Sequence, residues 1–289
     1  MPPTPDRTET DRRPSRRSIL KSAGAVGGLW TIGATGGAYP DGSGNGIPDR
    51  TEASPAVHDR LESLFGADQF EGFDPDRRDL LLDVRYVRGT SIHPETKRAL
   101  VDQFRRRGIY VQWLEYPTTY DRTWMERRYG WSTRALLWGR DSFYRAEVEP
   151  DLRNLAIQLF VVPGRSTQPY EGLVYSPTLA ALGTGRDGHV YGFSVGNRAL
   201  VTDRDDLEHE RRLLLHEIAH YALCHDDDPR NTGVMGTSES ATLMDHEWET
   251  LRTSLHHVRD TTGYDILARP CLWQECLGNV LGDLTSSPS

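Results

Sequence analysis

The hydrophobic positions of the central chain follow two patterns, one typical of buried strands and one typical of helices. Near-continuous apolar runs predict strands that are buried on both faces: 79–87 (DLLLDVRYV), 109–116 (IYVQWLEY) and 155–164 (LAIQLFVVPG). Between the first two, residues 94–107 have apolar positions at helical spacing, and Gly108 follows as a stop signal. A strand, a helix and a second strand in this order favour parallel pairing of the two strands.

Downstream, the pattern changes to short strands followed by a long helix. Three short strands are predicted between glycine-rich turns: 171–176, 189–195 and 198–203. A helix capped by Asp203 or Asp205 is predicted to run to about Cys224, and a last helix covers 243–258. Residues 117–153 show no clear period. These elements indicate the α+β class, with a mixed sheet, a strand-helix-strand start, one long helix and a C-terminal helix.

Composition narrows the class of protein. The chain has 289 residues, of which 37% are hydrophobic and 26% charged, as in globular proteins. Its formal charge of -8 argues against a nucleic-acid partner, and no apolar run approaches the ~20 residues of a membrane helix. Of the 34 basic residues only Lys21 and Lys97 are lysines. This acidic, arginine-rich balance favours a salt-loving microbe as the source; a GC-rich genome is the alternative.

The N-terminus has the features of an export signal. Residues 15–21 (SRRSILK) resemble the twin-arginine signal, with Arg16 and Arg17 as the pair, and 36–38 offer a small-residue cleavage site. The resemblance implies that residues 1–38 are removed and that the protein is secreted or held at the cell surface without a stable membrane anchor. Six basic and three acidic residues lie in this segment, so the mature chain carries -11. A disordered basic tail is the alternative.

Residues 41–52 (DGSGNGIPDRTE) have the spacing of a twelve-residue calcium loop, with Gly46 at the sharp turn. The expected ligands are five side chains and one backbone carbonyl: Asp41, Ser43, Asn45, Asp49, Glu52 and the carbonyl of Ile47. The segment resembles an EF-hand or thrombospondin type 3 loop, and a helix is predicted over 57–65. The resemblance implies weak Ca²⁺ binding, of about millimolar affinity. A Gly/Pro-rich linker is the alternative.

Residues 216–236 (HEIAHYALCHDDDPRNTGVMG) carry the candidate chemistry. Residues four apart lie on one helix face, so His216 and His220 can point at the same ion. Imidazole nitrogen suits Zn²⁺, and three protein ligands with one water form the catalytic arrangement. Glu217 lies beside this face and is placed to take a proton from the water. The pattern therefore indicates a zinc-dependent hydrolase.

The same segment resembles the metzincin peptidases, whose pattern is H-E-x-x-H-x-x-G-x-x-H followed by a methionine turn. His216, Glu217 and His220 match this pattern, and Met235 in NTGVMG matches the methionine of the turn. Leu223 stands where the family has glycine. The resemblance implies a metzincin-like fold and a zinc endopeptidase that hydrolyses peptide or protein substrates.

The third zinc ligand is where the chain departs from the family. His225 comes one residue early, whereas strict spacing selects Asp226, and snapalysin-like peptidases use aspartate there. We favour His225, because the proline and Val-Met landmarks that follow align when the turn is one residue shorter. Glu247 or Glu249 of the last helix would be the ligand in a gluzincin-like peptidase. A non-catalytic secreted metal-binding domain is a further alternative, because Leu223 replaces the family glycine.

The expected organisation has four parts: a signal peptide (1–38), the calcium loop and linker (39–78), the peptidase domain (79–265) and a C-terminal tail (266–289). Cys271 and Cys276 are close enough in sequence for a local disulfide; separate thiols are the alternative. Substrate is expected to bind along an edge strand, with 189–195 as the candidate, by strand addition.

Overall fold

The computed structural model describes residues 41–130, 136, 143–163, 192–195, 197–222, 232–235 and 240–253. Several sequence predictions lie outside these residues: the signal peptide, the strand at 171–176, Leu223, the third-ligand candidates His225 and Asp226, all three cysteines, the helical residues 254–258 and the tail 266–289.

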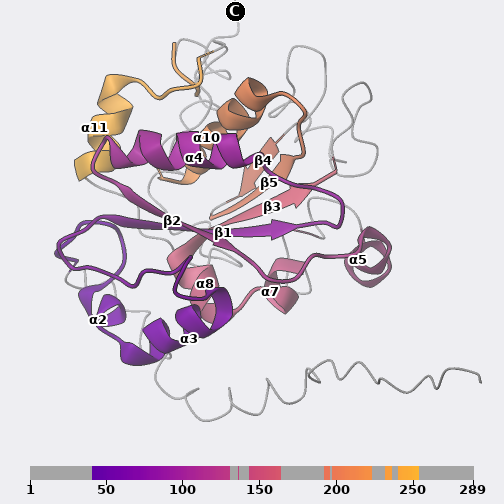
Figure 1. The fold of residues 1–289 in the computed structure, drawn as a ribbon, viewed down its shortest axis with the longest axis horizontal. Coiled ribbons are helices and arrows are strands. Elements are labelled where there is room, and N and C mark those ends of the chain that lie inside the picture. Colours follow the sequence, from indigo (N-terminus) through magenta and orange to yellow (C-terminus); the bar gives the residue numbers. More distant parts are fainter. Residues whose placement is uncertain are drawn as a thin grey trace, which may run out of the picture. The chain divides into compact units, whose positions relative to one another are not determined.

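Within the described residues, five strands form one mixed sheet in the order β2-β1-β3-β5-β4 (Figure 1). The strands are β1 (Asp79–Tyr86), β2 (Tyr110–Glu115), β3 (Ala156–Val162), β4 (Gly192–Val195) and β5 (Arg198–Thr202). The first four in this order are parallel, and β4 runs antiparallel to β5. The mixed sheet and its parallel strand-helix-strand start are as predicted from the sequence.

Helices cover both faces of the sheet (Figure 1). One face carries α4 (Pro94–Arg105), α10 (Leu207–Ala222) and α11 (Asp245–Thr253). The helices that contribute to the second hydrophobic core are α3 (Pro55–Phe65), α5 (Arg122–Tyr129), α7 (Phe143–Glu147) and α8 (Pro150–Leu155). The short helix α2 (Asp49–Glu52) precedes α3. Successive residues of β1 point to opposite faces, so Leu80 and Leu82 pack in the first core and Leu81 packs in the second. Burial on both faces explains why the central strands are apolar throughout.

Helix α10 is held against the sheet by an apolar stripe near its C-terminal end. Leu214, Leu215, Ile218 and Ala219 are buried in the first core, and the helix contacts β4, β5 and α4. The predicted caps Asp203 and Asp205 are wrong. The side chain of Asp206 accepts the N–H of His209 at 2.8 Å, which is the bond that an N-cap residue makes.

Helix α11 begins at Asp245, two residues later than predicted. The Glu247 carboxylate accepts the backbone N–H of Met244 at 2.6 Å, as the third residue of a helix does in a capping box. Trp248 packs edge-on against Phe104 of α4, with 5.2 Å between the ring centroids. Because Leu243 is buried just before the helix, the pattern of apolar residues begins earlier than the helical backbone.

Residues 41–78 pack as part of the main body. Ile47 of the calcium-type loop is buried in the second core, together with Val57, Leu61 and Phe65 of α3. The loop therefore contributes to the same core as the sheet. None of the helices in the described residues is long and apolar enough to cross a membrane.

A polar cluster is buried within the second core. The Arg85 side chain of β1 lies 2.9 Å from the Asp83 carboxylate and 2.7 Å from that of Glu149, which precedes α8. Its guanidinium also lies over the ring of Tyr116, 3.6 Å from the centroid. Burial raises the pKa of Asp83 to about 6; the positive charge of Arg85 opposes this rise, and the negative charge of Glu149 adds to it. The cluster ties the centre of the sheet to the start of α8.

We predict that the free energy of unfolding of the wild type falls, relative to that of Asp83→Asn, as the pH rises from about 4 to about 6. The folded protein holds the Asp83 proton more tightly than the unfolded chain, where the pKa is near its ordinary value of 3.8, so ionisation in this window costs stability. A pKa that rises from 3.8 to about 6 on folding corresponds to about 3 kcal/mol of unfolding free energy. Urea denaturation of both proteins across this range measures the difference, and a difference that does not vary with pH contradicts the prediction.

Candidate metal centre

Helix α10 brings His216 and His220 together on one face. Their Nε2 atoms lie 3.0 Å apart, and the ring centroids are separated by 4.5 Å with the ring planes 84° apart. The two ring nitrogens that could donate to a metal therefore face each other. This is the arrangement expected for two histidines one helical turn apart.

The orientation of His216 is fixed by the backbone of a distant segment. Its Nδ1 lies 2.8 Å from the carbonyl oxygen of Val234. A carbonyl can only accept a hydrogen bond, so Nδ1 carries the proton and donates it. In the neutral ring this leaves the lone pair on Nε2, the atom that faces His220. A hydrogen bond of this kind, on the far nitrogen of the ring, is typical of histidines that bind metals.

The geometry of this pair fits a zinc ion. At Zn–N distances of 2.0–2.1 Å, two nitrogens of a tetrahedral site lie about 3.3 Å apart. The observed 3.0 Å is close to that separation. Because His216 Nε2 carries a lone pair, this short separation calls for a proton on His220 Nε2 or for a cation between the two nitrogens.

Glu217 and Met235 are both buried. Glu217 directly follows His216 in α10, and its side chain is only 3% exposed. Met235 is fully buried in the first core, which also contains Leu215 and Ile218 of α10. The methionine follows Val234, whose carbonyl contacts His216 of α10.

The described residues do not complete the set of ligands. Within them, no three His, Cys, Asp or Glu side chains gather as a metal-holding group. Neither Glu247 nor Glu249 forms such a group with the two histidines. Glu247 caps α11, while the exposed Glu249 pairs with Arg252 at 2.6 Å. His225 and Asp226 lie outside the described part of the chain.

Sequence reasoning missed the groups that hold His216 in place. Val234 contributes its backbone carbonyl, and its own N–H donates to the carbonyl oxygen of Thr242 at 2.8 Å. Every residue except proline has both of these backbone groups, so no residue type could have marked these two positions as important.

The 41–52 loop turns its side-chain oxygens inward. Asp41 accepts the backbone N–H of Gly46 at 2.8 Å, and Asn45 accepts that of Ile47 at 2.7 Å. Asp49 reaches back to the N–H of Gly42 at 2.7 Å. Gly46 has a φ of 84°, so the predicted sharp turn is present at a position where side chains are strained.

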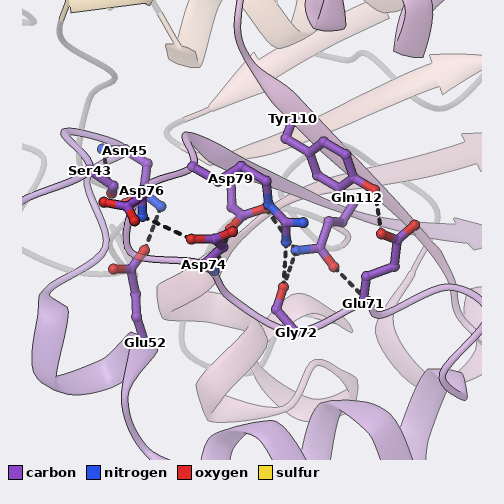
Figure 2. A network of polar contacts seen from close by, with 11 residues as sticks. Ser43, Asn45, Glu52, Glu71, Gly72, Asp74, Asp76, Asp79, Tyr110 and Gln112 are labelled. Carbon is purple, nitrogen blue, oxygen red and sulfur yellow. Dashed lines mark hydrogen bonds and ion pairs between the residues drawn. The ribbon is translucent and has the colours of Figure 1, made fainter.

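Glu52 closes this loop from below and is the most unusual group in it (Figure 2). Its side chain is 4% exposed, and one carboxylate oxygen accepts the Asn45 side-chain N–H at 2.7 Å. The other oxygen, Oε2, is buried and has no hydrogen-bond partner. Burial raises the pKa of Glu52; the bond from Asn45 opposes the rise, and the charges of Asp41, Asp79 and Asp49 add to it.

The loop is joined to the start of β1. Arg78 donates to the carbonyl of Gly44 at 3.3 Å, and a β-carbon added at Gly44 would meet the same guanidinium at 2.7 Å. Next to it, the buried Asp79 accepts bonds from Arg77 at 2.8 Å and from the Gln112 side chain at 3.0 Å (Figure 2). The loop therefore rests on a polar network that includes both β1 and β2.

No protein-family model matches the chain, and a search of curated proteins finds no match either. The likeness to metzincin peptidases therefore depends on the motif residues and on the site that His216 and His220 form.

Proposed function

We propose that this protein is an exported zinc-dependent endopeptidase. The observation that carries the proposal is the pair of Nε2 atoms of His216 and His220, which face each other at 3.0 Å while the Val234 carbonyl fixes the His216 ring. Export is proposed from Arg16 and Arg17 of the N-terminal segment, by resemblance to twin-arginine signals.

In this proposal His216 and His220 hold the ion through Nε2, and His225 supplies the third ligand. When bound, Zn²⁺ supplies Lewis acidity at the scissile carbonyl and lowers the pKa of the attacking water. Glu217 accepts a proton from that water as a general base and passes it to the nitrogen of the leaving amine. The buried position of Glu217 limits access of bulk solvent to its carboxylate.

The peptide substrate is proposed to bind along β4. This strand ends the sheet order within the described residues, pairs with β5 on one side and packs near α10. The other edge of the strand can accept an extended peptide by strand addition, which gives main-chain hydrogen bonds that do not depend on the substrate sequence. Such binding would place the peptide beside the helix that carries His216 and His220.

Replacing Glu217 by glutamine tests the chemistry. The amide cannot accept the water proton, so we expect turnover of a casein-type substrate to fall by about 10²–10⁴-fold while bound zinc is retained. Glu208→Gln, an exposed position on the same helix, is the matched control and should keep full activity. Zinc content and hydrolysis in high salt are measured together. If Glu217→Gln turns over like the wild type, the assigned base is wrong.

The third ligand is tested by zinc retention under a competing chelator. Because a zinc site built from two imidazoles holds the ion poorly, His225→Ala should lose zinc at much lower chelator concentrations than the wild type. Asp226→Ala should lose much less, and Glu249→Ala should match the wild type. A site emptied by Asp226→Ala but kept by His225→Ala would show that strict spacing, with aspartate as ligand, is correct.

We propose further that the 41–52 loop binds Ca²⁺. The specific observation is the buried, unpartnered Oε2 of Glu52, an oxygen without a donor close to the negative charges of Asp41 and Asp49. A cation would satisfy this oxygen and offset the repulsion. Ca²⁺ takes six to eight oxygen ligands, and the backbone carbonyl of Ile47 and the side chains of Ser43 and Asn45 supply neutral ones.

Calorimetric titration of chelator-stripped protein with CaCl₂ tests this second site. At ten times the dissociation constant, Ca²⁺ should add about 1.4 kcal/mol of stability, which raises Tm by about 3–6 °C for a domain of this size. Glu52→Gln should abolish both the heat of binding and the rise in Tm. Glu62→Gln, an exposed glutamate of α3, should keep both. A Ca²⁺ response that survives Glu52→Gln would contradict the proposed site.

A further inference from the structure

The position of the His216 ring depends on the backbone segment around Val234, which accepts its hydrogen bond. The Val234 carbonyl receives the Nδ1 proton at 2.8 Å, and the Val234 N–H is in turn bound by the Thr242 carbonyl at 2.8 Å. A shift of residue 242 therefore moves the peptide groups around Val234, and with them the acceptor that sets the tautomer of His216.

Thr242 is fixed by two helices through its side chain. Its hydroxyl oxygen accepts the side-chain N–H of Gln103 in α4 at 3.1 Å and the indole N–H of Trp248 in α11 at 3.4 Å. The hydroxyl proton is donated to the Leu243 carbonyl at 3.3 Å. A hydroxyl has one donor and two acceptor sites, so all of its hydrogen-bonding capacity is used here.

Gln103 also binds the neighbouring backbone. The same side-chain nitrogen donates to the carbonyl of Ala241 at 3.3 Å, so one amide group holds two consecutive residues. Trp248 is anchored independently by its edge-on contact with Phe104, the residue after Gln103 in α4. Helices α4 and α11 thus contact each other and both donate a hydrogen bond to Thr242.

We infer that Thr242 and Gln103 are positioning residues for the metal-binding His216. Neither touches the proposed ion. They act along a chain of hydrogen bonds that runs from the Gln103 amide through the Thr242 hydroxyl and carbonyl to Val234, and from Val234 to the imidazole. This inference rests on the proposed function in one respect: the ring that is positioned is taken to be a zinc ligand.

The test compares Thr242→Val and Gln103→Leu with the wild type. Thr242→Val keeps the β-branched shape and removes the hydroxyl, and Thr242→Ser restores it. Thr250→Val is the matched control, because it makes the same exchange on α11, where the Thr250 hydroxyl donates to the His246 carbonyl oxygen at 2.9 Å. Thr242 and Thr250 are exposed and Gln103 is half-buried, so all of these variants should fold, with Tm close to that of the wild type.

The first readout is the zinc dissociation constant in competition with a chromophoric chelator. Loss of a group that orients a metal ligand directly costs 10–100-fold in affinity; for these more remote groups we expect about 3–10-fold. Thr242→Ser and Thr250→Val should stay within about twofold of the wild type. Wild-type affinity in both Thr242→Val and Gln103→Leu overturns the inference.

The second readout does not need the metal. In the zinc-free protein, ¹⁵N NMR of the imidazoles should show His216 of the wild type as the Nδ1–H tautomer, with a mixture of tautomers in Thr242→Val. If the variants keep the wild-type tautomer, the positioning role is wrong even where zinc binds. If the tautomer changes but the wild type binds no zinc, the proposed function fails while the positioning of the ring stands.

Discussion

The hydrogen bond from the His216 imidazole to the Val234 carbonyl is the constraint on which the candidate site depends. A free imidazole can place its proton on either nitrogen, and only one of these forms leaves Nε2 able to bind a metal. By accepting from Nδ1, the carbonyl selects that form and sets the plane of the ring. Helix α10 then needs only its regular geometry to bring His220 to the same point, 3.0 Å away.

This constraint explains why the site needs elements far apart in the chain. Helix α10 is fixed to the sheet by Leu214, Leu215 and Ile218, while the 232–235 segment is fixed by buried Val234 and Met235. Helices α4 and α11 reach the same segment through Thr242. Because close-packed cores tolerate little displacement, the two parts of the site are held in register by packing rather than by the hydrogen bond alone.

The two proposed metal sites involve different hydrophobic cores. The histidines project from a helix of the first core, whereas the 41–52 loop sends Ile47 into the second, beside the residues of α3. Calcium binding is therefore expected to change the stability of the second core. Zinc binding is expected to change the hydrolytic activity at α10. The buried Asp83–Arg85 pair lies within the second core. Ionisation of Asp83 is therefore expected to change the stability of the fold without acting directly on the proposed zinc ligands.

The sequence by itself determined the elements whose signals are local. The apolar runs gave β1, β2 and β3 to within one or two residues, and the spacing of four placed His216 and His220 on one helix face. The glycine and oxygen pattern of residues 41–52 likewise predicted a turn with inward-facing oxygens. The sequence pattern was weak over residues 117–153, and the helices α5, α7 and α8 in this range were not predicted. The cap of α10 was also assigned to the wrong residues, because Asp206 is the one that caps it.

Only the tertiary structure decided which groups finish each site. The acceptor for His216 is a carbonyl eighteen residues away, held by another backbone group at Thr242. The position of Glu52 in the loop predicted it as a ligand, but its burial and its unpartnered oxygen are seen only in the folded chain. Side chains can be recognised in a sequence because their chemistry differs. Backbone carbonyls cannot, because they are the same in every residue. Burial cannot be recognised either, because it depends on which distant segments the fold brings together.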